Sequence, residues 1–260
     1  MSNTITCEWC GAVVEGADLD AFADAFLAHV RSVHSDFPYP DQAVRNYAEA
    51  TQRLTGGTER LDTIGTVTVE QVTRERIDDW LDFFDHDATA GTPQFAACYC
   101  SEPHLLDPKV PRPDQPQHTA RQNRDTMIAL LEQGRSFGYL AYVDAKPAAW
   151  VNASLRSEYR QYARGDGADP ADVDVIGISC FTVAPPYQRH GLAEALLEKV
   201  LDDAPARGAR WIEAYPMKAE LADRGKFRGA RAMYDAHGFT PVVTRAFDTV
   251  VRRAVAPPSA

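Results

Sequence analysis

Hydrophobic and polar residues alternate along this chain in two different patterns, which change near residue 60. In the first pattern, short β-type runs between Thr4 and Val14 flank a turn, and apolar residues then recur every three or four positions from Asp18 to His34. A second helix is expected from Gln42 to Leu54, with Asp41 as its N-cap. The pattern predicts a small ββα unit followed by a helix, over residues 1–57.

In the second pattern, from about residue 62, strand-type and helix-type segments alternate, which predicts an α/β (α+β) domain over residues 60–253. Residues 87–117 contain six of the 17 prolines and are not expected to be regular throughout. Residues 157–172 are a polar excursion, and residues 254–260 are expected to be a flexible tail. The expected elements are strand 63–72, helices 74–85 and 121–133, strands 137–143, 148–155 and 173–183, helix 191–201, strand 210–215, helix 230–237 and a last strand 239–251.

Composition narrows the class of protein. The chain is 45% hydrophobic and 25% charged, it has no apolar run near the ~20 residues that span a bilayer, and its first residues lack the features of a signal peptide. We therefore expect a cytoplasmic protein with no membrane partner. The net charge of −10 offers no basic face for phosphates, which argues against a nucleic-acid ligand. An odd number of cysteines, five, argues against a disulfide framework.

One strand–turn–helix segment carries candidate chemistry for binding an anion. A buried strand through Phe181 and Val183 leads into the turn Gln188-Arg189-His190-Gly191-Leu192-Ala193, and the helix that follows lacks an early proline or a side-chain cap. The first N–H groups of such a helix are unpaired and carry the positive end of its dipole, which a pyrophosphate satisfies. Small residues at Gly191 and Ala193 allow close approach of the backbone, and Arg189 adds positive charge.

This segment resembles the Gln/Arg-x-x-Gly-x-Gly/Ala signature of the GNAT acetyltransferase superfamily. Val183 lies five residues before Gln188, as the geometry of that family requires, and Tyr234-x-x-x-Gly238-Phe239 falls where its second cofactor-side motif is expected. The resemblance covers roughly residues 62–252. It implies the GNAT fold, a central mixed and mostly antiparallel sheet flanked by helices, and acetyl-CoA as the co-substrate.

The resemblance also implies roles for particular residues. The backbone N–H of Phe181 would polarise the acetyl carbonyl, and Val183 would pair with the pantetheine arm. Tyr234 would be the general acid that protonates the departing sulfur. The residues that the resemblance places on the pyrophosphate are Gln188, Arg189, His190, Gly191, Leu192 and Ala193.

The general base is less clearly marked. Some family members carry a glutamate four residues before the Phe181 position, and this chain has Gly177 there. Glu213, on the next expected strand, is our candidate for a base that acts directly or through water. Asp174 and His118 are weaker candidates, and the amine could also lose its proton through water alone.

Residues 95–104 lie between the first two helices of the domain, where the resemblance places the acceptor pocket. Cys98, Cys100 and His104 could in principle bind a metal, but Cys-x-Cys is a poor chelating spacing and buried thiols are usually packing groups. A cationic, partly apolar amine would suit the aromatic and acidic residues that we assign to this region. These residues are Tyr99, Trp150, Tyr215, Glu102 and Glu213.

The N-terminal unit contains Cys7-x-x-Cys10 and, after 18 residues, His29-x4-His34. Two thiolates and two imidazoles are ligands of tetrahedral zinc, and a zinc ion would hold together a unit with so small a core. The unit resembles small bacterial Cys/His domains, in which a Cys-x-x-Cys hairpin packs on a helix that ends in two histidines. A metal-free hairpin is the alternative. Eight acidic residues against three basic ones in residues 1–55 repel phosphate, which favours a structural or protein-docking role over DNA binding.

Our leading interpretation is an acetyl-CoA-dependent N-acetyltransferase that acts on a primary amine of a small molecule, with a structural zinc. Its oligomeric state is left open, a homodimer included. Two alternatives remain: a protein or peptide N-acetyltransferase whose zinc unit docks the target, and a non-catalytic acyl-CoA-binding regulatory protein. The intact turn and Tyr234 favour catalysis, whereas Gly177 keeps the non-catalytic alternative open.

Overall fold

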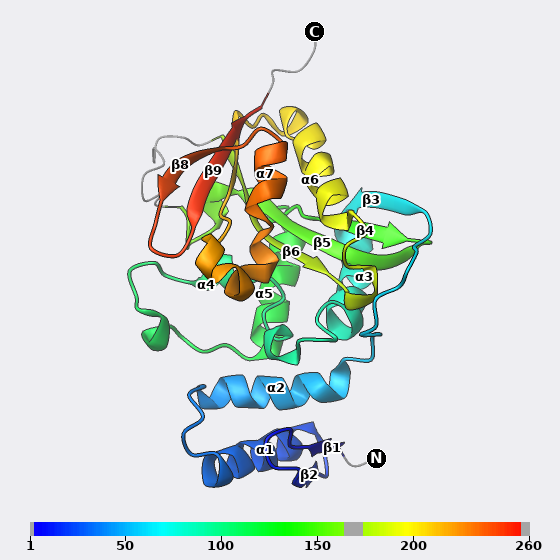
Figure 1. The fold of residues 1–260 in the computed structure, drawn as a ribbon, viewed down its shortest axis with the longest axis vertical. Helices are drawn as coiled ribbons and strands as arrows, with labels where there is room; N and C mark the ends of the chain where they lie inside the picture. The colour runs from blue at the N-terminus through cyan, green and yellow to red at the C-terminus, as the bar shows by residue number, and fades with distance from the viewer. Residues whose placement is uncertain (1–2, 164–173, 256–260) are drawn as a thin grey trace.

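A computed structural model describes residues 3–163 and 174–255 of the chain. The elements form a small N-terminal unit and a larger domain built on a seven-stranded sheet, and α2 lies between the two (Figure 1). The strands are β1 (Asn3–Thr6), β2 (Val13–Gly16), β3 (Val67–Gln71), β4 (Tyr139–Val143), β5 (Lys146–Leu155), β6 (Val175–Val183), β7 (Trp211–Ala214), β8 (Thr240–Thr244) and β9 (Thr249–Ala254). The α-helices are α1 (Leu19–Val33), α2 (Asp41–Arg53), α3 (Ile77–Asp82), α4 (Glu102–Leu105), α5 (Ala120–Glu132), α6 (Leu192–Asp203) and α7 (Arg231–Ala236).

The N-terminal unit is the predicted ββα arrangement followed by a helix. The β1–β2 hairpin packs on α1, and the carboxylate of Asp18 caps α1 by accepting a hydrogen bond from the N–H of Ala21 at 2.8 Å. The prediction that Asp41 caps α2 is wrong: the helix begins at Asp41, and Pro40 is its N-cap. Pro40 already supplies the extended entry to the helix, and the Asp41 carboxylate instead accepts a hydrogen bond from Arg31 Nε at 2.8 Å.

α2 also contacts the larger domain. A guanidinium nitrogen of Arg53 donates to the carbonyl oxygen of Phe84 at 3.0 Å and lies 3.1 Å from the carboxylate of Asp85. In the middle of the helix, Asn46 Nδ2 donates to the carbonyl oxygen of His118 at 3.0 Å. These contacts connect the zinc-finger-like unit to the sheet domain through specific side chains.

The larger sheet has the strand order β3-β4-β5-β6-β7-β9-β8. All neighbouring strands pair antiparallel except β6 and β7, which pair parallel. The mixed, mostly antiparallel sheet that we predicted is therefore confirmed. The single parallel pair lies near the middle of the sheet, and it positions the candidate site described below.

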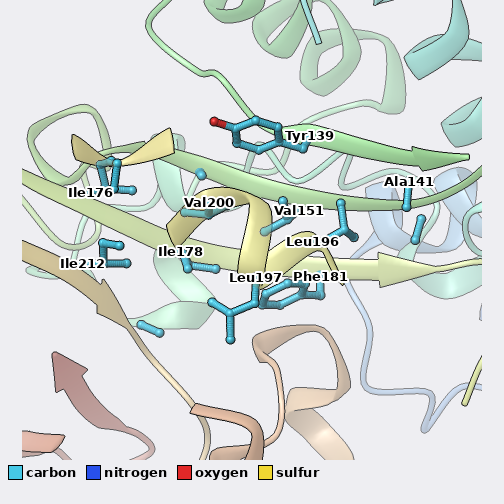
Figure 2. Close-up of a cluster of buried hydrophobic side chains, with 14 of the residues drawn as sticks. Tyr139, Ala141, Val151, Ile176, Ile178, Phe181, Leu196, Leu197, Val200 and Ile212 are labelled. Carbon is cyan, nitrogen blue, oxygen red and sulfur yellow. The ribbon is translucent and has the colours of Figure 1, made fainter. Parts of the chain in front are cut away.

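Helices cover both faces of this sheet. On one face, α6 packs Leu196, Leu197 and Val200 against Val151 and Phe181, as Figure 2 shows. Burying each such leucine contributes roughly 2 kcal/mol relative to leaving it in water. On the other face, helices α3 and α5 pack on β4 and β5. Their principal side chains are Trp80 and Met127, against Leu140, Tyr142 and Trp150.

Several predicted boundaries change in the structure. The prediction of a single strand over 239–251 is wrong, because β8 and β9 form a hairpin there. Two hydrogen bonds from the Arg245 guanidinium to the Asp248 carboxylate, at 2.6 and 2.9 Å, close the turn of this hairpin. The turn contains no glycine or proline, so the sequence did not mark it. Helix 74–85 is divided into a 3₁₀ turn, α3 and a π-helical turn over Phe83–Asp87. The predicted excursion beyond residue 163 and the tail beyond residue 255 lie outside the described residues.

None of the helices that the structure describes is long and apolar enough to cross a membrane.

Candidate active site

The turn between β6 and α6 is the first part of the candidate site. Gly191 is the N-cap of α6 with φ +80°, and Arg189, which carries a Cβ, has φ +68°. A left-handed non-glycine residue costs on the order of 1 kcal/mol or more and persists where its surroundings enforce it, often at functional sites. No described side chain caps α6, so its first N–H groups face the turn with the positive end of the helix dipole.

Two side chains of the turn are engaged by the protein itself. Gln188 Nε2 donates to the carbonyl oxygen of Val183 at 3.2 Å, and His190 Nε2 lies 2.9 Å from the carbonyl oxygen of Leu61. These contacts fix the turn against the end of β6 and against the segment that enters the domain. The turn therefore offers its backbone to an anion, with Arg189 exposed beside it.

β6 loses its partner strand before it reaches this turn. The parallel register between β6 and β7 ends at Ile178↔Ala214, whereas β6 continues to Val183. Beyond that point β6 pairs only with β5 among the described strands, with Val151↔Phe181 and Ala149↔Val183. Over Phe181 and Val183, the edge of β6 that faces away from β5 therefore has no partner among the described strands, and we call it the open edge.

Tyr234 lies in the core next to that open edge. Its ring centroid is 6.4 Å from the ring of Phe181, and its hydroxyl group donates to the carbonyl oxygen of Arg228 at 2.9 Å. The side chain is fully buried, and burial raises the pKa of the phenol above its ordinary value. The structure thus brings together Phe181 and Tyr234, which the sequence separates by 53 positions.

Glu213 is in a setting that does not suit a base. Its carboxylate is fully buried and accepts hydrogen bonds from Arg156 at 3.1 Å and from Arg252 Nε at 2.9 Å. The hydroxyl group of Tyr215 donates to its second oxygen at 3.3 Å. A carboxylate held by two guanidinium groups and a phenol has its lone pairs occupied, so it would connect β7 to β9 and to the end of β5 rather than accept a proton from an amine.

The two weaker candidates for the base also lie away from the open edge. Asp174 is exposed, and its carbonyl oxygen accepts the N–H groups of Arg210 and Trp211 ahead of β7. His118 lies beside α2, where its carbonyl oxygen accepts the hydrogen bond from Asn46.

A cavity of about 430 Å³ adjoins β6 on the face opposite α6. The 3₁₀ segment η8 (Ala219–Arg228), the segment 95–103 and the β8–β9 turn complete its wall. Tyr99 and Glu102 line it as predicted, whereas Trp150, Tyr215 and Glu213 are not among its lining residues. The wall comprises Phe84, Thr89, Phe95, Cys98, Tyr99, Cys100, Glu102, Pro103, Arg112, Gln161, Ser179, Cys180, Thr182, Met217, Phe227, Arg228, Phe247 and Asp248.

The charged side chains of this wall are engaged with one another or with neighbours. Glu102 pairs with Arg112 at 2.5 Å, and the carboxylate of Asp248 pairs with Arg228 at 3.7 Å and with Arg245 at 2.6 Å. The uncharged part of the wall has 14 residues, and five of them are aromatic. It also contains three neutral oxygen atoms, on Thr89, Gln161 and Ser179, that are buried without a hydrogen-bond partner among the described residues. A wall of this kind suits a small, partly apolar molecule with hydrogen-bond donors.

Part of this wall has no motif in the sequence. Gln161, Met217, Arg228 and Asp248 come from segments that no motif marks, and the fold brings them to the cavity from positions 62 or more residues from Tyr99. The only sequence signal for these four residues was that they lie in or near expected strands, helices and loops. The contribution of the 95–104 segment could be predicted, because the resemblance placed the acceptor pocket there.

The four predicted metal ligands come together in the N-terminal unit. The Cys7, Cys10, His29 and His34 ligand atoms all lie within 4.8 Å of one another. Sγ of Cys7 is 3.4 Å from Nε2 of His34, and Sγ of Cys10 is 3.4 Å from Nε2 of His29. A tetrahedral zinc with ordinary Zn–S and Zn–N bonds places sulfur and nitrogen about 3.5 Å apart. The donor set and its spacing therefore fit zinc.

Comparisons with known proteins bear on the larger domain. The model of the Acetyltransferase (GNAT) family matches residues 103–239, more than half of the chain. No curated protein gave a match. Among similar solved structures are a GNAT-family acetyltransferase from Streptococcus pneumoniae (13% identity, TM-score 0.43, 74% of this chain and 100% of that one) and the ribosomal-protein-S18-alanine N-acetyltransferase from Escherichia coli (14%, 0.42, 75% and 97%). A third is PaiA N-acetyltransferase from Thermoplasma acidophilum in complex with coenzyme A (9%, 0.46, 73% and 99%). With TM-scores below 0.5, these three add nothing to the family match.

Proposed function

Because the chain belongs to the GNAT family of acetyltransferases and is an N-acetyltransferase, we propose that it transfers the acetyl group of acetyl-CoA to a primary amine of a small molecule. The observation that carries this proposal is the cavity of about 430 Å³ beside the open edge of β6. Pockets of that order hold small molecules. The open edge beside it would receive the thioester end of the donor.

For the donor, we assign the pyrophosphate of acetyl-CoA to the turn Gln188–Ala193. Gln188 and His190 would contribute through their backbone, since their side chains contact the carbonyl oxygens of Val183 and Leu61. Arg189 adds a cation, Gly191 allows close approach, and the N–H groups of Leu192 and Ala193 begin α6. The N–H of Phe181 would polarise the acetyl carbonyl, and the backbone of Val183 would pair with the pantetheine arm.

We propose Tyr234 as the group that donates a proton or hydrogen bond to the departing sulfur. The raised pKa keeps its phenol protonated throughout the ordinary pH range, so the donor is always present. The Arg228 carbonyl oxygen orients the hydroxyl group, and the nearby ring of Phe181 places it beside the residue proposed to bind the acetyl carbonyl.

For the base, we propose that Glu102 replaces our earlier candidate Glu213. Among the described residues, the cavity has two carboxylates, and that of Asp248 is held by two hydrogen bonds from Arg245. In the part of the chain that the structure describes, Glu102 forms an ion pair only with Arg112, and the two side chains are 40% and 63% exposed. Such exposed ion pairs contribute at most about 1 kcal/mol, so Glu102 can exchange this partner for a water that receives the proton of the amine.

The cavity wall supports an amine with a partly apolar, preferably aromatic, body. Its charged side chains are already paired, so a second charge on the acceptor would find no free partner of opposite sign among the described lining residues. The buried oxygens of Gln161 and Thr89 can accept hydrogen bonds from an ammonium group. The rings that would contact the body of the acceptor are Phe84, Phe95, Tyr99, Phe227 and Phe247.

The test is CoA release from acetyl-CoA over a matched panel of acceptors. The panel would contain a phenylalkyl monoamine, an aliphatic polyamine, free amino acids, and peptides with a free N-terminus or an internal lysine. We expect the largest kcat/KM for the apolar monoamines. Preferential turnover of the peptides would replace the small-molecule acceptor with a protein. Tight binding of acetyl-CoA without turnover of any acceptor would contradict the proposal as a whole.

Two further proposals concern the N-terminal unit, residues 1–57. We propose that Cys7, Cys10, His29 and His34 bind one structural zinc ion, because the four ligands fill a tetrahedral shell and leave no position for a substrate. We also propose that this unit and residues 60–253 are separate domains. The role of the unit would then be to support the catalytic domain through the contacts of Arg53 and Asn46.

A further inference from the structure

Two thiol groups face each other in the wall of the cavity. Sγ of Cys100 lies 3.0 Å from Sγ of Cys180, although the two residues are 80 positions apart. A disulfide has an S–S length of about 2.05 Å, so the two atoms need to approach by only about 1 Å to form one. Neither thiol has a role in the proposed acetyl transfer. From this arrangement we propose that Cys100 and Cys180 are a redox modification site, which forms a reversible disulfide across the wall of the acceptor cavity.

The backbone holds the Cys100 thiol in place at an energetic cost. Tyr99 and Cys100 have φ values of +48° and +56°, in the left-handed region that residues with a Cβ rarely adopt. The conformation is enforced from two sides: Asn152 Nδ2 donates to the carbonyl oxygen of Cys100 at 2.9 Å, and the hydroxyl group of Tyr99 donates to Asp85 at 2.5 Å. Consecutive strained residues of this kind are a feature of functional sites.

Cys180 is held on the opposite side by the sheet. It lies on β6 directly across from Asn152, so the residue that fixes Cys100 also pairs with Cys180. The hydroxyl group of Thr182 lies 3.8 Å from the Cys100 sulfur and 3.7 Å from the Cys180 sulfur. Both thiols are thus ordered before any reaction, and closing the bond requires little rearrangement of the chain.

The two thiols differ in reactivity. Burial raises the pKa of Cys100, whereas the hydrogen bond that Cys100 donates lowers the pKa of Cys180. Cys180 is therefore the sulfur that attacks an oxidant, because the thiolate is the nucleophilic form. Burial raises the pKa of the third cysteine in the wall, Cys98, to about 12, which makes it a poor competitor.

The chemistry with a peroxide balances in two steps. The Cys180 thiolate attacks one oxygen of hydrogen peroxide, which breaks the O–O bond and gives a sulfenic acid and hydroxide. The Cys100 thiol then attacks the sulfenic sulfur, and the oxygen leaves as water once it has taken up a proton. The two thiols lose two electrons and two protons in total, and the peroxide becomes two molecules of water. A dithiol reverses the change by thiol–disulfide exchange.

The disulfide would act on the acceptor side of the reaction. It pulls the segment 98–101 towards β6, next to Phe181, and removes two thiols from the cavity wall. A displacement of 1 Å near reacting groups can lower a rate by up to about 100-fold. We expect oxidation to lower amine turnover by at least about tenfold and to leave acetyl-CoA affinity within about twofold, because the turn Gln188–Ala193 is not part of this wall.

The test uses the full zinc-loaded chain, treated with hydrogen peroxide and then with an alkylating reagent for free thiols. Peptide mapping is expected to show a Cys100–Cys180 cross-link with a loss of two hydrogens, which dithiothreitol reverses. The Cys98→Ser variant should form the same cross-link. In Cys100→Ser no cross-link should form, and Cys180→Ser should keep its own untreated turnover after peroxide. Zinc content, measured in parallel, separates this effect from oxidation of Cys7 and Cys10.

The absence of a cross-link in the wild-type chain, or a cross-link through Cys98, would overturn the proposal. Full amine turnover by the cross-linked protein would overturn its effect on the acceptor cavity. A reversible cross-link in a protein that acetylates none of the amines would contradict the proposed function and would leave the disulfide itself established. The mass measurement therefore tests the disulfide, the turnover measurement tests the proposed function, and either proposal can be contradicted without the other.

Discussion

The hydroxyl group of Tyr234 donates its hydrogen bond to the carbonyl oxygen of Arg228 at 2.9 Å, in a fully buried position. Gly229 allows the chain to pass over the phenol, because a Cβ at that position would lie 2.7 Å from the Tyr234 oxygen. Gly229 also has φ +75°, which a larger residue would adopt only with strain. The segment that orients the phenol thus also lines the cavity through Arg228.

Replacing Tyr234 by phenylalanine removes the proposed donor and keeps the ring packing. We expect kcat for amine acetylation to fall by about 10²-fold, and the Kd of acetyl-CoA to stay within about twofold. Steady-state kinetics and equilibrium titration measure the two quantities. The control is Tyr139→Phe, a buried phenol of β4 that is not part of the cavity wall. Unchanged kcat in Tyr234→Phe would remove Tyr234 from the mechanism.

Gly191→Ala tests the anion site at the start of α6. Gly191 has φ +80°, and a Cβ there would meet no atom within 4 Å, so the substitution strains the backbone without a clash. We expect about 1 kcal/mol of destabilisation and a weaker acetyl-CoA affinity by at least about tenfold, because the turn moves away from the geometry that exposes its N–H groups. Urea unfolding and acetyl-CoA titration measure these effects.

The matched control for this substitution is Gly208→Ala. Gly208 has φ +71° and equally open surroundings, but it follows the C-terminal end of α6. Both variants should lose similar stability, and only Gly191→Ala should lose acetyl-CoA affinity. Equal acetyl-CoA affinities for the two variants would contradict the assignment of the pyrophosphate to this turn.

Local patterns carried much of the fold prediction. The apolar spacing of α6 and the nearly continuous apolar runs of β4 and β5 appear in the sequence, because α6 buries one face and the two strands bury both. The same holds for the turn Gln188–Ala193, where unpaired N–H groups and small residues are local properties. The Cys/His cluster of the N-terminal unit could also be predicted, since two short spacings define it. In each case the physical cause lies within a few residues of the signal.

Non-local contacts could not be predicted in this way. Glu213 was a plausible base on its strand, and only the fold shows that Arg156 and Arg252, 57 and 39 positions away, occupy its oxygens. The division of the last strand into β8 and β9 depends on the Arg245–Asp248 contact, which no glycine or proline announces. The contact between the Cys100 and Cys180 thiols is likewise non-local. It depends on the left-handed backbone of Tyr99 and Cys100 and on the position of Cys180 in β6.

Glu213→Gln tests the structural role of this carboxylate. The Glu213 side chain is 1% exposed, and its partners Arg156 and Arg252 are 4% and 12% exposed, so the charge is removed from a nearly dry cluster. Removing one charge of a buried cluster costs about 3–5 kcal/mol, and we expect a loss in the lower part of that range because glutamine keeps the shape. Urea unfolding measures the loss.

The control for Glu213→Gln is Asp235→Asn, which breaks an exposed pair with Arg231 and should cost less than about 1 kcal/mol. If Glu213→Gln unfolds at the same urea concentration as the wild-type chain but loses turnover, the carboxylate is a catalytic group after all, and our reassignment of the base to Glu102 is wrong.

Removing zinc should unfold the N-terminal unit. A metal assay on the purified chain is expected to give one zinc per chain, and a strong chelator or Cys10→Ser should abolish it. Because the core of this unit is small, we expect circular dichroism to show loss of the α1 signal and earlier thermal unfolding. Cys98→Ser is the control that should keep its zinc. A chain without zinc that retains the full helical signal would leave the metal-free hairpin as the correct interpretation.

His104 gives the stability of the protein a defined pH dependence. Burial lowers the pKa of His104 to about 4, from 6.5 in the unfolded chain, and its Nδ1 lies 3.0 Å from the carbonyl oxygen of Glu158. The folded state binds this proton less readily than the unfolded state. The contribution of neutral His104 to the free energy of unfolding is therefore fully present above pH 6.5 and is lost as the pH falls towards 4. The loss is about 2 kcal/mol at pH 5 and about 3 kcal/mol when complete.

Urea unfolding at pH 7.5, 6 and 5 measures this loss. His104→Asn removes the titrating group and keeps a donor for the Glu158 carbonyl oxygen, so it should lose about 2 kcal/mol less than the wild-type chain between pH 7.5 and 5. His118→Asn is the control and should follow the wild-type curve. Parallel pH curves for His104→Asn and the wild-type chain would show that His104 is not held neutral by burial.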